Sequence, residues 1–148
     1  MKDRLDTDSK PDSGGQSIFS LLKAAHALED KVESTLAAAG LSGPKFAVLG
    51  VLVAAKEPLP LGELADRLSC VKSNATQMID RLEADGLVRR IPDPDDRRSV
   101  RAEVTQRGRE RHAAGATAMT ELEARFSDAV EAEDRSAVAR MLRSIEST

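Results

Sequence analysis

The sequence has few of several residue types, and each scarcity narrows what the chain can be. It contains one cysteine, Cys70, no Trp or Tyr, and three phenylalanines among 148 residues. A single cysteine excludes an intramolecular disulfide and a zinc site built from several cysteines. With aromatics at 2%, a core must come from aliphatic side chains and Met. No apolar run approaches bilayer-spanning length and no secretion signal is visible, so we expect a cytoplasmic protein without a membrane partner.

Charge of either sign is not in large excess, but it is unevenly distributed. The net charge is −3 over the whole chain. Residues 67–111 carry eleven Lys or Arg against eight Asp or Glu, whereas the remainder carries eleven against seventeen. A basic middle between acidic ends is typical of a DNA-binding lobe on an acidic scaffold. Ordinary variation of a solvated surface would give the same counts, so charge alone does not separate the two interpretations.

Hydrophobic spacing predicts a mainly α chain with one β-hairpin. Apolar residues recur three and four positions apart in most segments, whereas two short runs have β character. The expected helices occupy residues 17–40, 44–57, 62–68, 72–85, 106–131 and 134–146, and the expected strands occupy 87–91 and 100–105. Residues 1–16 are polar and contain Pro and Gly, so we expect a disordered tail there.

Particular residues mark the ends of these helices. Gly40 and Gly86 suit the glycine position that follows a helix, and Gly86 is expected there in a left-handed conformation. Pro44 fits a first helical turn. Thr105 and Asp134 can cap the last two helices, although no Glu or Gln follows Thr105 at the spacing of a capping box.

The order of two short helices and then a hairpin predicts a winged helix-turn-helix. In that fold the second helix of the pair enters the DNA major groove with its N-terminal residues at the base edges. Here those residues are polar types that suit bases and phosphates. They are Lys72, Ser73, Asn74, Thr76 and Gln77. A solvated polar helix face is the alternative, and short polar faces are common.

The hairpin tip, DPDDRRSV, favours the DNA interpretation. An arginine on a protruding tip fits the narrow, negatively charged minor groove. Arg97 and Arg98 are adjacent there, and Asp95 or Asp96 can hold one guanidinium while the other reaches the groove. The alternative is an exposed ion pair in a turn, worth ~0–1 kcal/mol and without a function.

With these motifs the chain resembles the MarR family of winged-helix regulators. The family hallmark is an Asp-x-Arg wing followed by a hydrophobic residue and Thr-x-x-Gly. Here these are Asp96-Arg97-Arg98 and Val104-Thr105-Gln106-Arg107-Gly108, and Asp80-Arg81-Leu82-Glu83 and Gly86-Leu87-Val88 also match. The resemblance follows the element order over about residues 17–146, with its motifs in 61–108.

The resemblance implies a homodimer that reads a near-palindromic operator. Residues 17–40 and 106–148 would dimerise, and residues 41–105 would form the winged helix-turn-helix DNA-binding domain. The recognition helix would span about 72–85 and the wing 92–99. Repression is the commoner role in the family, so we expect a repressor, although activation fits the same sequence.

Roles in DNA contact carry over from the family to matching positions. Arg98 would enter the minor groove, Arg97 would contact phosphate or the groove, and Asp96 would position Arg98. Arg81 and Lys72 are the expected phosphate contacts. Two positions depart from the family. Val71 stands where Ser often caps the recognition helix, and Gln77 stands where Arg is frequent.

Residues that could sense a signal are few. Family members commonly release DNA when a small, often aromatic, ligand binds, and others sense oxidants through cysteine. Cys70 precedes the recognition helix beside Lys72, which favours a reactive thiolate, but lone cysteines are more often packing residues. His26 and His112 could bind a carboxylate or a metal, yet two histidines make a poor metal site, and histidines at a helix surface or interface are the better interpretation. The Met119, Leu122 and Phe126 stripe fits a dimer core better than a ligand pocket.

Two rival classes remain for comparison. An enzyme is disfavoured because the sequence has no recognisable catalytic motif, no phosphate-binding glycine loop and no paired catalytic carboxylates, and we expect no cofactor or metal. A protein-interaction module would use the same winged fold to bind another protein. Salt dependence separates it from DNA binding, because phosphate contacts weaken steeply with salt.

Overall fold

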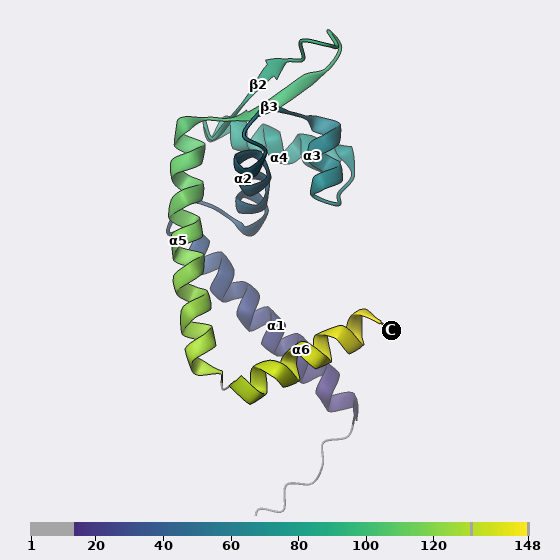
Figure 1. The fold of residues 1–148 in the computed structure, drawn as a ribbon, viewed down its shortest axis with the longest axis vertical. Helices are drawn as coiled ribbons and strands as arrows, with labels where there is room; N and C mark the ends of the chain where they lie inside the picture. Colours follow the sequence, from purple (N-terminus) through teal and green to yellow (C-terminus); the bar gives the residue numbers. More distant parts are fainter. Residues whose placement is uncertain (1–13, 131, 148) are drawn as a thin grey trace, which may run out of the picture. The chain divides into compact units, whose positions relative to one another are not determined.

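The computed structural model describes residues 14–130 and 132–147 (Figure 1). The chain divides into two compact units, Met1–Lys31 and Val32–Thr148. Within the described ranges no helix is long and apolar enough to span a membrane.

The first helix, α1, runs through the boundary between the units. It spans Gly14–Ala37 and therefore begins earlier than the predicted residue 17. The remaining part of the predicted tail, residues 1–13, lies outside the described residues. In the first unit the apolar side chains of α1 are largely exposed, and Phe19 reaches 75%.

The second unit contains the other helices and a small sheet in the predicted order. The helices are α2 (Gly43–Ala55), α3 (Leu61–Arg67), α4 (Lys72–Ala84), α5 (Gln106–Ala129) and α6 (Ala132–Glu146), and the strands are β1 (Leu59–Pro60), β2 (Val88–Pro92) and β3 (Val100–Val104). The predicted class, mainly helical with a β-hairpin wing, is confirmed. In Figure 1 the connection between β2 and β3 projects past α3 and α4.

The predicted glycine stops are confirmed, because both glycines have positive φ and close the helix before them. Gly40 has φ +70° and Gly86 has φ +71°. After α1 the Leu41 N–H donates to the Leu36 carbonyl at 3.1 Å, and after α4 the Leu87 N–H donates to the Leu82 carbonyl at 2.9 Å. These bonds satisfy carbonyls that have no partner within the helix.

The sheet has three strands rather than the two that the hairpin predicted. The antiparallel order is β1-β3-β2, with Leu59 opposite Ala102 and Val88 opposite Val104. β1 escaped prediction because two residues have no periodicity, and because Pro60 reads as a helix breaker. A proline is tolerated there since β1 is an edge strand.

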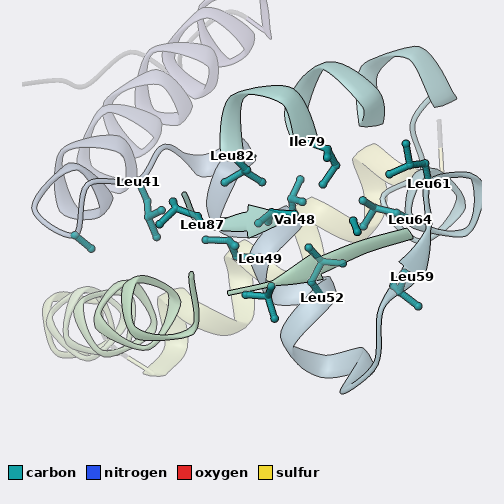
Figure 2. Close-up of a cluster of buried hydrophobic side chains, with 14 of the residues drawn as sticks. Leu41, Val48, Leu49, Leu52, Leu59, Leu61, Leu64, Ile79, Leu82 and Leu87 are labelled. Carbon is teal, nitrogen blue, oxygen red and sulfur yellow. The ribbon is translucent and has the colours of Figure 1, made fainter. Parts of the chain in front are cut away.

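The core lies between α2, α4 and the sheet, and it is aliphatic as the composition requires (Figure 2). Val48, Leu49 and Leu52 of α2 are at most 2% exposed, and Ile79 and Leu82 of α4 are fully buried. Burying each such side chain stabilises the fold by about 1.5–3 kcal/mol. This core holds α4 with one face inward and the other face free.

The junction between the sheet and α5 explains the Thr-x-x-Gly motif. Thr105 is the predicted N-cap, its hydroxyl accepting from the Gly108 N–H at 3.0 Å and donating to the Gly86 carbonyl at 2.8 Å. A Cβ on Gly108 would lie 2.1 Å from the Leu87 carbonyl oxygen, so only glycine fits. The motif therefore fastens α5 to the start of β2.

The final helix differs from prediction at its start. α6 begins at Ala132, so Asp134 lies inside its first turn and is not the N-cap. An acidic residue is favourable there as well, because the N-terminal turn carries partial positive charge.

Candidate nucleic-acid interface

The turn between α3 and α4 sets the angle of the predicted recognition helix. The Cys70 N–H donates to the Ala65 carbonyl at 3.0 Å, and the Ser69 N–H donates to the Asp66 carbonyl at 3.1 Å. Ser69 adopts φ +51°, a left-handed conformation that glycine usually occupies. The backbone thus turns within four residues from α3 into α4.

The outer face of α4 carries the predicted base-reading side chains. Lys72, Ser73, Asn74 and Gln77 are exposed, and the apolar stripe beneath them, which includes Ala75 and Ile79, is buried. Thr76 differs, because it is half-buried and its hydroxyl donates to the Lys72 carbonyl at 3.0 Å. Thr76 can therefore contact a base only through its methyl group or through its hydroxyl oxygen as an acceptor.

The start and end of α4 also match expectation. Val71 occupies the N-cap position and gives no side-chain cap, which leaves the first amides of α4 without that partner. Such amides attract phosphates. Arg81 lies exposed one turn before the C-terminus of α4, so it is accessible to a phosphate.

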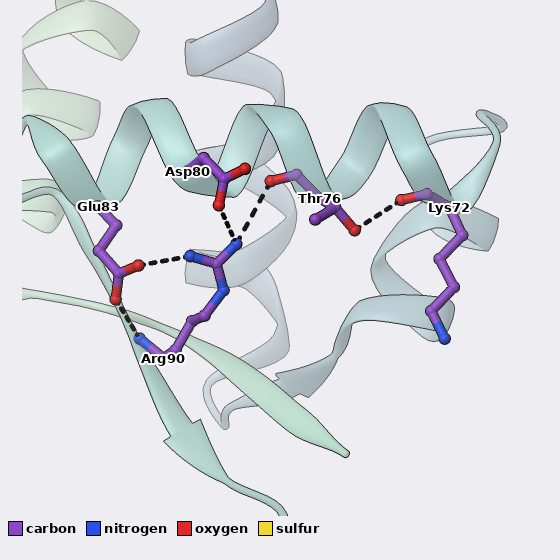
Figure 3. A network of polar contacts seen from close by, with 5 residues as sticks. All are labelled: Lys72, Thr76, Asp80, Glu83 and Arg90. Carbon is purple, nitrogen blue, oxygen red and sulfur yellow. Dashed lines mark hydrogen bonds and ion pairs between the residues drawn. The ribbon is translucent and has the colours of Figure 1, made fainter. Parts of the chain in front are cut away.

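A network that sequence reasoning missed ties α4 to the wing (Figure 3). Arg90 of β2 donates from Nη1 to Glu83 and from Nη2 to Asp80, each at 2.5 Å, and its backbone N–H donates to Glu83 at 3.0 Å. Partial burial acts to lower the pKa of Arg90, but Asp80 and Glu83 outweigh it, so the pKa lies above its ordinary value. No local spacing signals this contact, because the two acids lie on a helix and the arginine on a strand.

The wing tip is held differently from the prediction. The tip sequence predicts that Asp95 or Asp96 holds Arg97 or Arg98, but Asp95 and Asp93 instead bind Arg101 of β3. Arg101 Nε lies 3.0 Å from Asp93, and Nη2 lies 3.2 Å from Asp95. Arg101 could be overlooked because it lies in the strand rather than at the tip.

Asp96 contacts the backbone instead of a guanidinium. Its carboxylate accepts from the Arg98 N–H at 2.9 Å. Among the residues that the structure describes, the guanidinium groups of Arg97 and Arg98 have no hydrogen bond or ion pair, and both side chains are exposed. The two arginines are therefore free to bind a ligand of negative charge.

Asp93 is buried, whereas residues 94–98, which follow it at the tip, are exposed. It is 8% exposed, the one charged side chain in the buried set of described residues. The Arg101 hydrogen bond, followed by that from the Asp95 N–H, holds the pKa of Asp93 below its ordinary value. Asp93 is consequently ionised throughout the neutral range.

The predicted sensing residues lie on different elements. Cys70 is half-buried in the turn before α4. His26 is exposed on α1, 3.2 Å from Glu29, and His112 of α5 stacks on Phe46 with ring centroids 4.9 Å apart. Burial lowers the pKa of His112, so the ring is neutral at pH 7. In the described part of the chain no group of three or more potential metal ligands occurs.

Comparison with known proteins agrees with this geometry. The MarR family model matches residues 41–100. YetL, a transcriptional repressor of Bacillus subtilis, is 32% identical over 113 residues, which cover 75% of this chain and 68% of YetL. BadR, a transcriptional activatory protein of Rhodopseudomonas palustris, is 34% identical over 104 residues, which cover 69% of this chain and 59% of BadR.

A solved structure extends the likeness to most of the fold. Sco5413, a MarR family transcriptional regulator from Streptomyces coelicolor, superposes with a TM-score of 0.71 and 26% identity, and covers 88% of this chain and 91% of that one. The chain spans 51% and 59% of the length of two curated regulators that it matches. The sequence predicts a regulator rather than an enzyme, and these findings agree. The chain belongs to the MarR family of winged-helix transcriptional regulators.

Proposed function

We propose that this chain is a homodimeric regulator that binds a near-palindromic DNA operator. The recognition helix, α4, would lie in the major groove of each half-site. The wing, residues 92–99, would lie in the adjacent minor groove. The proposal places the protein in the cytoplasm, where a regulator of this kind meets the chromosome.

The observation that carries the proposal is the presence of two surfaces whose polar groups are available to a ligand. One is the exposed set on α4, formed by Lys72, Ser73, Asn74 and Gln77. The other is the tip with Arg97 and Arg98, whose guanidinium groups have no partner among the described residues. Each well-made base contact discriminates by about 1–3 kcal/mol, so a few such contacts suffice for a half-site.

The charge balance on α4 also suits DNA. Asp80 and Glu83 would repel phosphates if they were unpaired, but both are bound to Arg90. Lys72 and Arg81 then remain as exposed cations on the same helix. The Arg90 network therefore favours approach of a polyanion as well as tying α4 to β2.

The homodimer part of the proposal is supported by apolar side chains that lie open on the C-terminal helix. Exposed large apolar residues of α6 are Val138, Met141, Leu142 and Ile145. Phe126 near the end of α5 is also 42% exposed. Contiguous apolar surface of this kind marks an interface in a water-soluble chain.

Repression is the regulatory direction that we propose. YetL, of which this chain covers 68%, is a repressor, whereas BadR, of which it covers 59%, is an activator. Either action requires the same DNA contacts, so the direction follows from where the operator lies relative to the promoter.

Release by a small ligand completes the proposal. An open cavity of about 400 Å³ is lined by Lys45, Arg107 and Arg111 together with Asp85. The excess of cations suits a carboxylate-bearing molecule. Oxidation of Cys70 is the alternative trigger, and peroxide treatment of wild type beside a Cys70→Ser variant distinguishes the two.

Fluorescence anisotropy with the duplex upstream of the protein's own reading frame tests DNA binding directly. We expect tight binding that falls steeply with salt, and unrelated duplex should bind far more weakly. Arg98→Ala should weaken operator binding about tenfold, because it removes a minor-groove contact. Adding benzoate in the same assay examines ligand release.

The matched control is Arg125→Ala, which removes an exposed arginine about 30 Å along α5 from its start. It should leave affinity unchanged. Equal loss in both arginine variants would mean that total charge, and not the wing, governs binding. A response to salt that is weak throughout would favour the protein-interaction module.

A further inference from the structure

An ion pair outside the family hallmark residues joins the wing tip to β3. Arg101 Nη2 donates to one carboxylate oxygen of Asp93 at 3.1 Å and to Asp95 at 3.2 Å. Arg101 Nε lies 3.0 Å from the other carboxylate oxygen of Asp93, as an ion pair without hydrogen-bond geometry. We call these three residues the Arg101 clamp. Asp93 is 8% exposed, whereas the Asp95 side chain is 84% exposed, so the pair with Asp93 is the enclosed part.

The clamp closes a loop whose backbone is already tied together. The Asp93 N–H donates to the Ser99 carbonyl at 3.1 Å, and the Asp93 carboxylate accepts from the Asp95 N–H at 2.9 Å. Ser99 and Arg98 both donate backbone N–H groups to Asp96 at 2.9 Å. Arg101 therefore anchors a closed seven-residue tip, 93–99, to the strand β3.

The anchor leaves Arg97 and Arg98 unbound while it fixes the backbone that carries them. Ordering a flexible tip on DNA would cost conformational entropy for each residue fixed. Removing Arg101 would leave the enclosed Asp93 carboxylate without its guanidinium partner and with the Asp95 N–H as its remaining hydrogen-bond donor. The tip must then open to let water reach the carboxylate.

We propose that Arg101 and Asp93 are positioning residues that preset the wing tip so that Arg98 enters the minor groove without further ordering. This inference rests on the proposed DNA-binding function. Arg101 touches no DNA in this scheme, and its effect on affinity passes through Arg98.

A double-mutant cycle in the operator-binding assay tests the proposal. Arg101→Ala should weaken binding about as much as Arg98→Ala, about tenfold. In the Arg101→Ala background, Arg98→Ala should then have little further effect. Lys72→Ala should retain its full effect in that background, because the major-groove contacts do not depend on the clamp.

Two readouts in the free protein separate positioning from general destabilisation. Amide hydrogen exchange at Arg98 and Ser99 should accelerate in Arg101→Ala, while the amides of Ile79 and Leu82 in the core keep wild-type protection. Arg101→Lys retains the charge without the planar fork and should give an intermediate loss of affinity. Should Arg101→Ala fail to fold, Asp93→Asn replaces it in the cycle with the same expectation.

The matched control is Arg89→Ala, which removes an ion pair with Glu103, the residue directly opposite it on β3 and two positions from Arg101. It should leave the effect of Arg98→Ala intact. The clamp proposal is wrong if Arg101→Ala binds like wild type, or if the effects of Arg98→Ala and Arg101→Ala multiply. Failure of the proposed function is a separate result, in which wild type shows no preference for any duplex.

Discussion

Single residues decide how closely the parts of the winged lobe approach one another. Gly108 is the clearest case, because the space for its side chain is already filled by backbone. A Cβ there would meet the Leu87 carbonyl oxygen at 2.1 Å and a Val104 methyl carbon at 2.8 Å. The Leu87 carbonyl also accepts from the Thr105 N–H at 3.0 Å, so this backbone group cannot move aside as a flexible side chain can.

Gly108→Ala should therefore lower the free energy of unfolding by about 3 kcal/mol, the range of an overpacked core. Gly62→Ala is the matched control, because nothing lies within 4 Å of a Cβ at that helical position. It should be neutral or stabilising by up to about 1 kcal/mol. Urea midpoints at equal protein concentration compare the two. Similar midpoints would mean that the junction between β2 and α5 is loose.

At the scale of helices and turns, the backbone conformation of one turn is strained. The turn between α3 and α4 has a serine at φ +51°, where glycine would sit without cost. The strain of a left-handed non-glycine residue is of order 1–3 kcal/mol, partly offset by the entropy that glycine loses on folding.

Ser69→Gly should raise the stability of the lobe by about 1 kcal/mol, because the relieved strain exceeds the entropy lost. Ala54→Gly, at an exposed helical position of α2, should lower it by a similar amount. Thermal unfolding followed by circular dichroism gives both values. A lower melting temperature for Ser69→Gly would show that the serine side chain stabilises the turn.

The elements were largely predictable because their signals are local. Helical spacing, Pro44, Gly86 and Thr105 all act within a few residues, and they are found where expected. Strand β1 was missed because its pairing with β3 joins residues about forty positions apart. A pattern within two residues cannot report such a contact.

The candidate site was predictable in its residue types but not in its pairings. The exposed face of α4 follows from periodicity, and the exposure of Arg97 and Arg98 follows from their place at a tip. The sequence wrongly predicted that Asp95 or Asp96 holds one of these two arginines. The partners of Arg90 and Arg101 do not, because each lies on a strand and meets acids that belong to another element or turn. Charge pairing over such distances depends on the fold, and several acids compete for each arginine.

At the scale of the whole molecule, large apolar side chains are exposed on helices outside the winged lobe. Leu142 and Ile145 of α6 are each 51% exposed. In the first unit Ile18 is 63% exposed. Surface of this kind is stabilised when a second copy covers it, and the proposed homodimer supplies that copy.

Leu142→Glu should convert the proposed dimer to monomer, because a charge in an apolar interface is costly to desolvate. Operator affinity should fall as well, since both half-sites are then bound independently. Arg140→Glu, an exposed polar position of the same helix, is the control and should remain dimeric. Sedimentation velocity measures the mass. A wild-type protein that sediments as a monomer at micromolar concentration would remove the dimer from the proposal.

The contacts of Gly86, Thr105 and Gly108 couple the first turn of α5 mechanically to β2. Its 24 residues extend about 36 Å. Its N-cap Thr105 is hydrogen-bonded to Gly86, and Gly108 in its first turn packs directly on the backbone of Leu87, the residue before β2. A tilt of the helix must carry β2 with it, and the Arg90 network passes that motion on to α4. We therefore expect α4 and the wing to move as one body. Farther along, α5 is still held to the lobe, because Arg111 donates to the Ala39 carbonyl at 2.9 Å and Met119 packs against the core. In the proposed dimer, any adjustment of the distance between half-sites would therefore come from the part of α5 beyond Met119.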